Sequence, residues 1–136
     1  MKIRYTDERT FTAAQLEKLF LSVDWESGKY PEKLKKALDN CGTVYTAWDG
    51  NELVGLANAI DDGAMTAYVH YLLVAPEYQG QGIATALLEL MKKRYCDYHH
   101  FFLVAEHKDL VGFYKKQGFK EQVETSVMLY KEHNDE

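Results

Sequence analysis

The stretch that most constrains this chain is an apolar strand that runs through a glycine turn directly into a helix. Residues 72–76 read Leu-Leu-Val-Ala-Pro, and Gly80 and Gly82 follow shortly after. The apolar residues then recur at helical spacing, which predicts a helix over 82–95. The first turn of such a helix has N–H groups without helical acceptors, and glycines let a ligand approach the backbone. The stretch therefore predicts an anion site at a helix N-terminus.

The other elements follow from changes in the period of the apolar residues. The pattern predicts strands over 2–6, 43–48, 52–60, 66–74, 101–105 and 123–130, and helices over 13–23, 30–40, 82–95 and 109–116. The order β-α-α-β-β-β-α-β-α-β predicts an α/β (α+β) fold with a mixed, largely antiparallel central sheet and helices on both faces. At 136 residues the chain has the length of one domain, predicted over 1–136.

Composition excludes several classes of protein and of partner. With 46% hydrophobic residues, the chain can bury a core without a disulfide or metal staple. A net charge of −5 disfavours binding to nucleic acid, and the longest apolar stretch, residues 71–76, is too short to span a membrane. We therefore expect no nucleic-acid or membrane partner, a cytoplasmic location, and free thiols at Cys41 and Cys96.

The glycine turn has three interpretations on its residues alone. A Walker A loop is excluded, because no Gly-Lys-Ser/Thr follows the glycines. A dinucleotide fingerprint fits poorly, because Thr85 stands where the third glycine should be. A strand-to-helix turn without any ligand is the interpretation that a lone glycine pair would favour.

The surroundings of the glycines favour a ligand. Residues 74–88 read Val-x-Pro-x-x-Gln-Gly-x-Gly-Ile-Ala-x-x-Leu-Leu, and residues 113–119 read Phe-Tyr-Lys-Lys-Gln-Gly-Phe. The first motif resembles the acyl-CoA pyrophosphate loop of the GCN5-related N-acetyltransferase (GNAT) superfamily. The second resembles that superfamily's aromatic-Tyr-x-x-x-Gly-Phe signature. The motifs stand in the superfamily's order, one helix and one strand apart, and the resemblance in element order covers the whole chain.

The resemblance implies an enzyme that transfers an acetyl group from acetyl-CoA to a primary amine, by direct attack in a ternary complex and without a metal. It implies that the pantetheine arm pairs with the backbone of Leu72, Leu73 and Val74, as an added strand would. The implied pyrophosphate site consists of Gln79, Gly80, Gln81, Gly82, Ile83, Ala84 and Thr85. The alternative is a non-catalytic acyl-CoA-binding module that acts as a sensor or partner.

Tyr114 matches the superfamily's tyrosine near the sulfur of CoA, where a phenol of pKa ~10 can protonate the departing thiolate. Two positions depart from the superfamily's pattern. His107 stands where an asparagine often contacts the CoA arm. Phe102 stands where several members have a catalytic glutamate, and this argues against a glutamate-based protein N-terminal acetyltransferase mechanism.

The attacking amine must lose a proton, and His70 is the first candidate to accept it. His70 lies two residues before Leu72 on one predicted strand, so strict alternation places it on the face of Leu72 and Val74. A hydrogen-bonded structural histidine is an equally weighted alternative. Asp61 and Asp62 are second candidates, and water is the third.

The acceptor stays open among lysine, polyamine, arylalkylamine, aminoglycoside and peptide N-terminus. The shortness of the chain favours a small-molecule amine. Trp25, Tyr30 and Trp48 are candidates for the wall of the acceptor site, with core packing as the alternative for the tryptophans. Members of the superfamily often form dimers, so we expect a homodimer. His99 and His100 are not expected to bind a metal, because adjacent strand residues face opposite ways.

Overall fold

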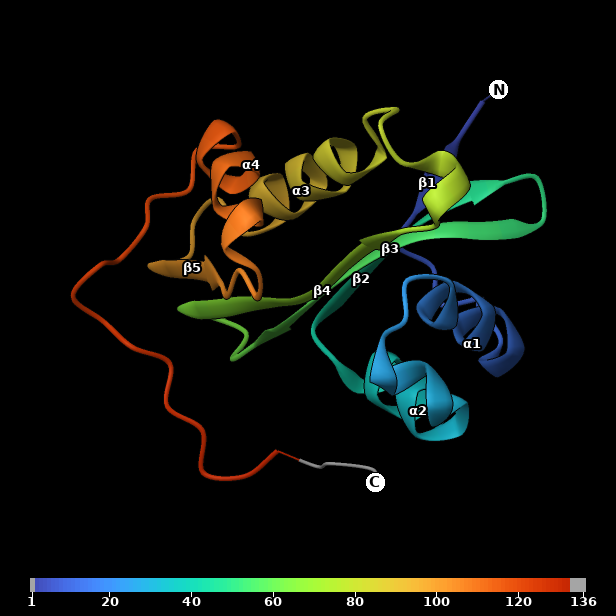
Figure 1. Ribbon diagram of the computed structural model, residues 1–136, viewed down its shortest axis with the longest axis horizontal. Helices are drawn as coiled ribbons and strands as arrows, with labels where there is room; N and C mark the ends of the chain where they lie inside the picture. The colour runs from blue at the N-terminus through green and yellow to red at the C-terminus, as the bar shows by residue number, and fades with distance from the viewer. Residues whose placement is uncertain (1, 133–136) are drawn as a thin grey trace. The chain divides into compact units, whose positions relative to one another are not determined.

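A five-stranded sheet in the order β1-β2-β3-β4-β5 organises the first part of the chain (Figure 1). Its strands are β1 (Arg4–Thr6), β2 (Thr43–Asp49), β3 (Glu52–Asp61), β4 (Thr66–Val74) and β5 (His100–Leu103). Neighbours from β1 to β4 pair antiparallel, and β5 pairs parallel with β4. The predicted mixed, largely antiparallel sheet is confirmed.

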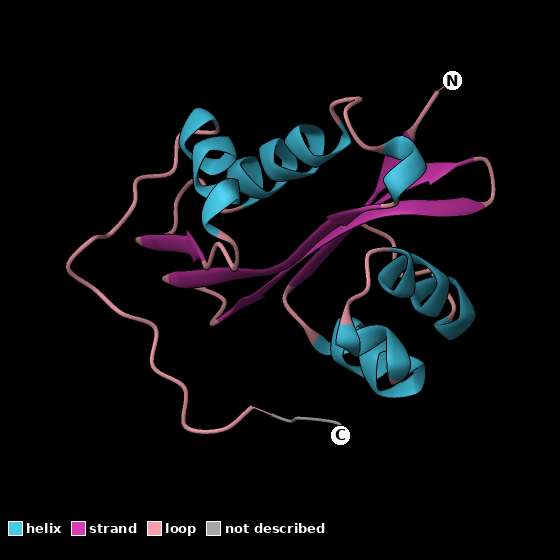
Figure 2. Ribbon diagram, in the orientation of Figure 1, coloured by secondary structure: helices cyan, strands magenta, loops and turns pink. Residues whose placement is uncertain are grey.

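The computed structural model describes residues 2–132, and the chain divides into two units after Val104. The first unit holds the sheet and the helices α1 (Ala13–Ser22), α2 (Pro31–Asn40) and α3 (Ile83–Arg94), with the 3₁₀ turns η1 (Glu26–Lys29) and η2 (Pro76–Tyr78). The second unit holds η3 (Lys108–Leu110) and α4 (Val111–Lys116) (Figure 2). Among the described residues, no helix has the length and apolar character needed to cross a bilayer.

Helices cover both faces of the sheet in the first unit. Leucines of α1 and α2 pack on one face, around Phe20, Val44 and Leu56. Leu87 and Met91 of α3 pack on the opposite face, among the small side chains of β3 and β4. Figure 1 shows α1 and α2 on one side of the strands and α3 on the other. Burial of these apolar faces is the main force that holds the layers together.

Local signals set the ends of several helices. Thr12 and Gln15 form a capping box at the start of α1, with Thr12 Oγ1 accepting from the Gln15 N–H at 3.1 Å. Pro31 stands at the first position of α2, where its missing N–H costs nothing. Gly118 has a φ of +98° and closes α4, as a glycine beyond a helix end does. The last helix, predicted from Asp109, begins instead at Val111, because residues 108–110 form a 3₁₀ turn, and no side chain caps its start.

A bulge in β4 decides which way its side chains point. The register of β3 against β4 shifts, so that Asn58 alone faces both His70 and Tyr71. Asn58 is buried, and its Oδ1 accepts a hydrogen bond from the N–H of Tyr71 at 2.8 Å. Tyr71 therefore packs on the face that α1 and α2 cover, whereas Leu72 packs on the α3 face.

The predicted strand over 123–130 is not formed in the structure. Its large apolar side chains are exposed, namely Val123, Val127, Met128, Leu129 and Tyr130. Alternating apolar residues show only which face of a strand would be apolar. Pairing also needs a free sheet edge to satisfy the backbone N–H and C=O groups. Within residues 2–132, β5 stays at the edge of the sheet.

Candidate active site

The glycine turn has the geometry that an anion site requires. Gly80 and Gly82 have φ values of +78° and +85°, and a Cβ added to either would meet nothing within 4 Å. Gly82 caps α3, whose first hydrogen bond runs from the N–H of Ala86 to the C=O of Gly82 at 3.0 Å. The N–H groups of Ile83 and Ala84 therefore point out of the helix end without a helical acceptor. Together with the helix dipole, they favour a bound anion.

Side chains fix the start of this turn. Gln79 Nε2 donates to the C=O of Val74 at 2.9 Å, which ties the turn to the end of β4. The hydroxyl of Tyr78 in η2 donates to Asp49 Oδ2 at 2.6 Å, and this hydrogen bond is the main reason that the pKa of Tyr78 rises to about 12. These two hydrogen bonds fix the start of the turn. Gly80, Gln81 and Gly82, which follow, are exposed.

Within the first unit, β4 has an open edge just before the turn. The ladder between β4 and β5 ends at the pair Val69–Leu103, whereas β4 runs on to Val74. The N–H groups of Tyr71 and Ala75 point toward β3, where they donate to Asn58 Oδ1 and to a backbone carbonyl. By alternation the backbone of residue 73 also faces β3, and that of residues 72 and 74 faces the open edge. Backbone pairing with a pantetheine arm, which we predicted for Leu72, Leu73 and Val74, is therefore open to Leu72 and Val74 and not to Leu73.

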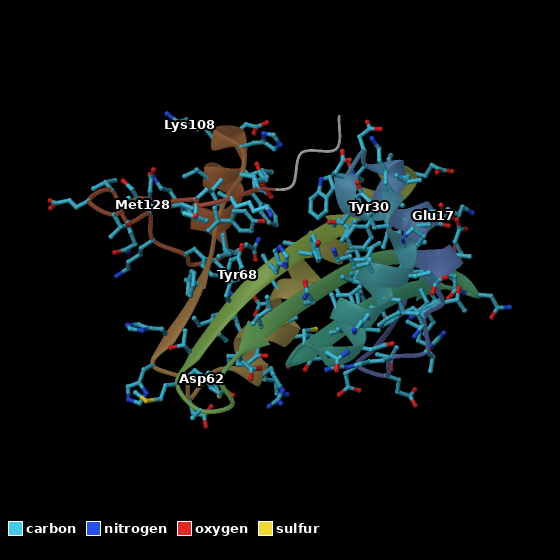
Figure 3. All side chains as sticks on the ribbon, turned by 90° about the horizontal axis from the view of Figure 1, so that it is seen from below. Glu17, Tyr30, Asp62, Tyr68, Lys108 and Met128 are labelled. Carbon is cyan, nitrogen blue, oxygen red and sulfur yellow. The ribbon has the colours of Figure 1, made fainter. Side chains whose placement is uncertain are left out.

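The side chains near this edge form an aromatic row, made of Phe102, Tyr68, His70, Tyr71 and Trp25. Successive ring centroids lie 5.1, 5.5, 4.1 and 5.7 Å apart in that order. The row lies on the face of the sheet that α1 and α2 partly cover, and Figure 3 looks toward this face, with Tyr68 labelled on β4.

His70 belongs to this row, and the prediction that it shares a face with Leu72 and Val74 is wrong. Strict alternation from Leu72 would turn His70 toward α3. The bulge adds one residue to β4, so His70 instead stacks on Tyr71, on the α1 and α2 side.

The tryptophans have different environments. Trp25 is half-buried and ends the aromatic row. Trp48 is only 4% exposed, and its Nε1 donates to Thr46 Oγ1 at 2.8 Å. Trp48 is therefore a core residue, and its predicted role in the acceptor wall is wrong. Tyr30 is half-buried between η1 and α2.

Comparison with known proteins decides the family. The sequence matches the family described as "Acetyltransferase (GNAT) domain" over residues 9–129. The chain belongs to the GNAT acetyltransferase family. The resemblance of its two motifs is thereby confirmed, and so is the fold class.

Relatives of this GNAT protein include an uncharacterized N-acetyltransferase, ycf52, of Pyropia yezoensis, which is 32% identical over 86% of this chain and 70% of that protein. The ycf52 protein of Gracilaria tenuistipitata var. liui is 34% identical over 76% of this chain, and the match spans 59% of its own length. Among solved structures, the GNAT family protein SP0256 of Streptococcus pneumoniae TIGR4 has a TM-score of 0.83 at 26% identity, and the match covers 98% of this chain and 100% of that one.

The signature tyrosine of this GNAT protein, Tyr114, lies in the second unit on α4. Its half-buried ring meets those of Phe113 and Phe119 edge-on. Burial, and then the charge of Glu106, raise the pKa of the Tyr114 hydroxyl above its usual value, so this group stays protonated at neutral pH. His107 is exposed at the start of η3, where its C=O accepts a backbone hydrogen bond.

The two aspartates that were second candidates for the base have structural partners. Asp62 Oδ1 accepts hydrogen bonds from the backbone N–H groups of residues 64–66, at 2.7 to 3.1 Å. These bonds lower the pKa of Asp62 to about 2, which makes it a poor proton acceptor at neutral pH. Asp61 Oδ2 accepts from the Tyr95 hydroxyl at 2.5 Å.

No group of three or more His, Cys, Asp and Glu side chains stands ready to bind a metal ion in the described part of the chain. Cys41 is half-buried and Cys96 is exposed, and both are free thiols.

No sequence motif pointed to Tyr68 and Tyr71 as members of the aromatic row or to Asn58 as the residue at the bulge. The two-residue spacing of Tyr68 and His70 was the one visible signal, since it places both on the same face of a strand. The sequence had no signal for the bulge, which arises where β3 and β4 pair.

Proposed function

We propose that this GNAT protein transfers the acetyl group of acetyl-CoA to the primary amine of a small molecule. The observation that carries the proposal is the continuity of two features: the open edge of β4 at residues 70–74 leads into the open backbone of Gly80 and Gly82. An extended arm that ends in a diphosphate suits the pair. The edge offers strand-like hydrogen bonds, and the helix end offers N–H donors to the phosphates.

The bound thioester supplies an acetyl carbon that an amine nitrogen can attack. The new N–C bond forms, the C–S bond breaks, the nitrogen releases a proton and the sulfur gains one. We assign the donated proton to the hydroxyl of Tyr114, which its raised pKa keeps protonated. We assign acceptance of the amine proton to His70, directly or through one water. α3, whose N-terminus is the proposed phosphate site, lies on one face of the sheet. His70 lies on the opposite face, and we propose that the amine approaches from there.

Calorimetric titration of acetyl-CoA into two variants of Gly82 tests the binding site. Asparagine and aspartate tolerate the positive φ of this position better than other side chains, and both have room here. Only Gly82→Asp adds a negative charge. Repulsion from a phosphate ~4 Å away at an effective dielectric constant of ~20 costs about 4 kcal/mol, or roughly a thousandfold in affinity.

We therefore expect Gly82→Asp to bind acetyl-CoA at least a hundredfold more weakly than Gly82→Asn. Equal affinity of the two variants for acetyl-CoA would show that its phosphates do not bind at Gly82.

A non-catalytic acyl-CoA-binding module is the second candidate, because Phe102 and His107 depart from the pattern of the superfamily's motifs. Thiol release from acetyl-CoA with a panel of amines separates the two. Tight binding without release of CoA would favour the module.

A further inference from the structure

The aromatic row defined above carries an inference about the acceptor, and this inference rests on the proposed function. The row lies on the face of the sheet opposite α3 and its glycine turn. Tyr68 and Phe102 pair with each other one position before Val69–Leu103, the last pair of β4 and β5 before the two strands part. In the proposed function the thioester lies where β4 and β5 part. An amine that approaches it from this face of the sheet must pass along these rings.

The rings of the row present their edges. Phe102, Tyr68, His70 and Tyr71 stack with interplanar angles of 21° to 28°, so the faces of the inner rings are covered by their neighbours. His70 is exposed although stacked rings flank it on both sides, so its edge meets the solvent, and Phe102 at the end of the row is 46% exposed. A ring edge carries positive partial charge, which attracts the face of another aromatic ring and repels a cation.

The row contains no carboxylate, which a polycationic acceptor such as a polyamine would need to offset the loss of its hydration. Its rings are also held in place. The Tyr71 hydroxyl bonds to Ser27 Oγ at 2.7 Å, and the fully buried ring of Phe20 meets Tyr71 edge-on at 4.9 Å. A surface that is already ordered loses little entropy when a flat ligand binds.

We propose that the acceptor is a primary amine carried on a short chain by a flat aromatic ring, and that this ring rests face-on against the edges of the aromatic row. Its amine then points toward the open edge of β4, beside His70. Phe102 acts as a specificity-determining residue at the outer end of the row.

The test compares phenethylamine with cyclohexylethylamine, which has the same carbon count and the same amine but a saturated ring. Release of CoA thiol at saturating acetyl-CoA gives kcat/KM for each amine and for spermidine. Edge-to-face contacts with two rings of the row predict about a tenfold preference for phenethylamine over cyclohexylethylamine. Spermidine should be the poorest of the three.

Phe102→Leu removes one ring, and because Phe102 is partly exposed the core stays intact. We expect it to lower the preference for phenethylamine over cyclohexylethylamine to about threefold or less. Met65→Ala is the matched control, since Met65 is a similarly exposed apolar residue outside the row, and it should keep the full preference.

Equal or faster acetylation of cyclohexylethylamine or spermidine by wild type would overturn this inference and leave acetyl transfer standing. An unchanged preference in Phe102→Leu would overturn the part assigned to Phe102. Absence of thiol release with every amine would instead overturn the proposed function, and this inference with it.

Discussion

Replacing Asn58 by alanine should release the bulge that directs His70 and Tyr71. Asn58 is 3% exposed, and its Oδ1 is the acceptor for the N–H of Tyr71 at 2.8 Å. In Asn58→Ala this N–H loses its partner inside the protein, where an unsatisfied donor costs about 1–3 kcal/mol. For a chain of 136 residues, a loss of that size lowers the Tm by about 4–10 °C.

Thermal unfolding and urea titration measure this loss, and Asn40→Ala serves as the control. Asn40 is exposed and donates to the Lys36 carbonyl within α2, so its replacement should change stability by less than about 0.5 kcal/mol. Hydrogen exchange adds a local readout, because the amide of Tyr71 should exchange faster in Asn58→Ala than in wild type. An Asn58→Ala variant no less stable than Asn40→Ala, or a Tyr71 amide that keeps its protection, would show that Asn58 does not hold the bulge.

Three further outcomes are expected. Tyr114→Phe should lower kcat by about a hundredfold while the KM for acetyl-CoA changes little, since general acid catalysis acts on the departing thiolate; steady-state kinetics with unchanged kcat would make Tyr114 a packing residue. His70→Ala should lower kcat and abolish the rise of rate with pH that a general base produces; a pH–rate profile that keeps this rise would move the role to water. Asp62 has a pKa lowered in the folded state from 3.8 to about 2, so its stabilisation is present above pH ~4 and is lost as the pH falls toward 2. Unfolding of Asp62→Asn should therefore depend less on pH in this window, and a dependence identical to wild type would contradict the assignment.

Signals that act over a few residues predicted the framework well. The capping residues of α1, Pro31 at the start of α2 and Gly82 before α3 each mark a helix end, because their effect is local. The strand bounds of β4 were likewise predicted as observed, from apolar residues that end at a proline. The glycine motif and the Tyr114 motif placed the chain in its family for the same reason: close contact of a backbone with a ligand demands particular residues at short spacing.

Pairing between distant segments was less predictable. Residues 123–130 alternate as a strand does, yet the structure leaves their apolar side chains exposed. Alternation is a property of the segment alone, whereas a strand also requires backbone hydrogen bonds to a neighbouring strand, and among residues 2–132 this segment pairs with none.

The sequence by itself determined the family, the order of the elements through α4 and the position of the glycine turn at the start of α3. Only the tertiary structure decided the side of the sheet on which His70 lies. Asn58 stands 13 residues before Tyr71 and meets it only when β3 and β4 pair. Side chains alternate strictly along a strand, so the one extra residue at that bulge moved His70 into the aromatic row and left Leu72 on the opposite face.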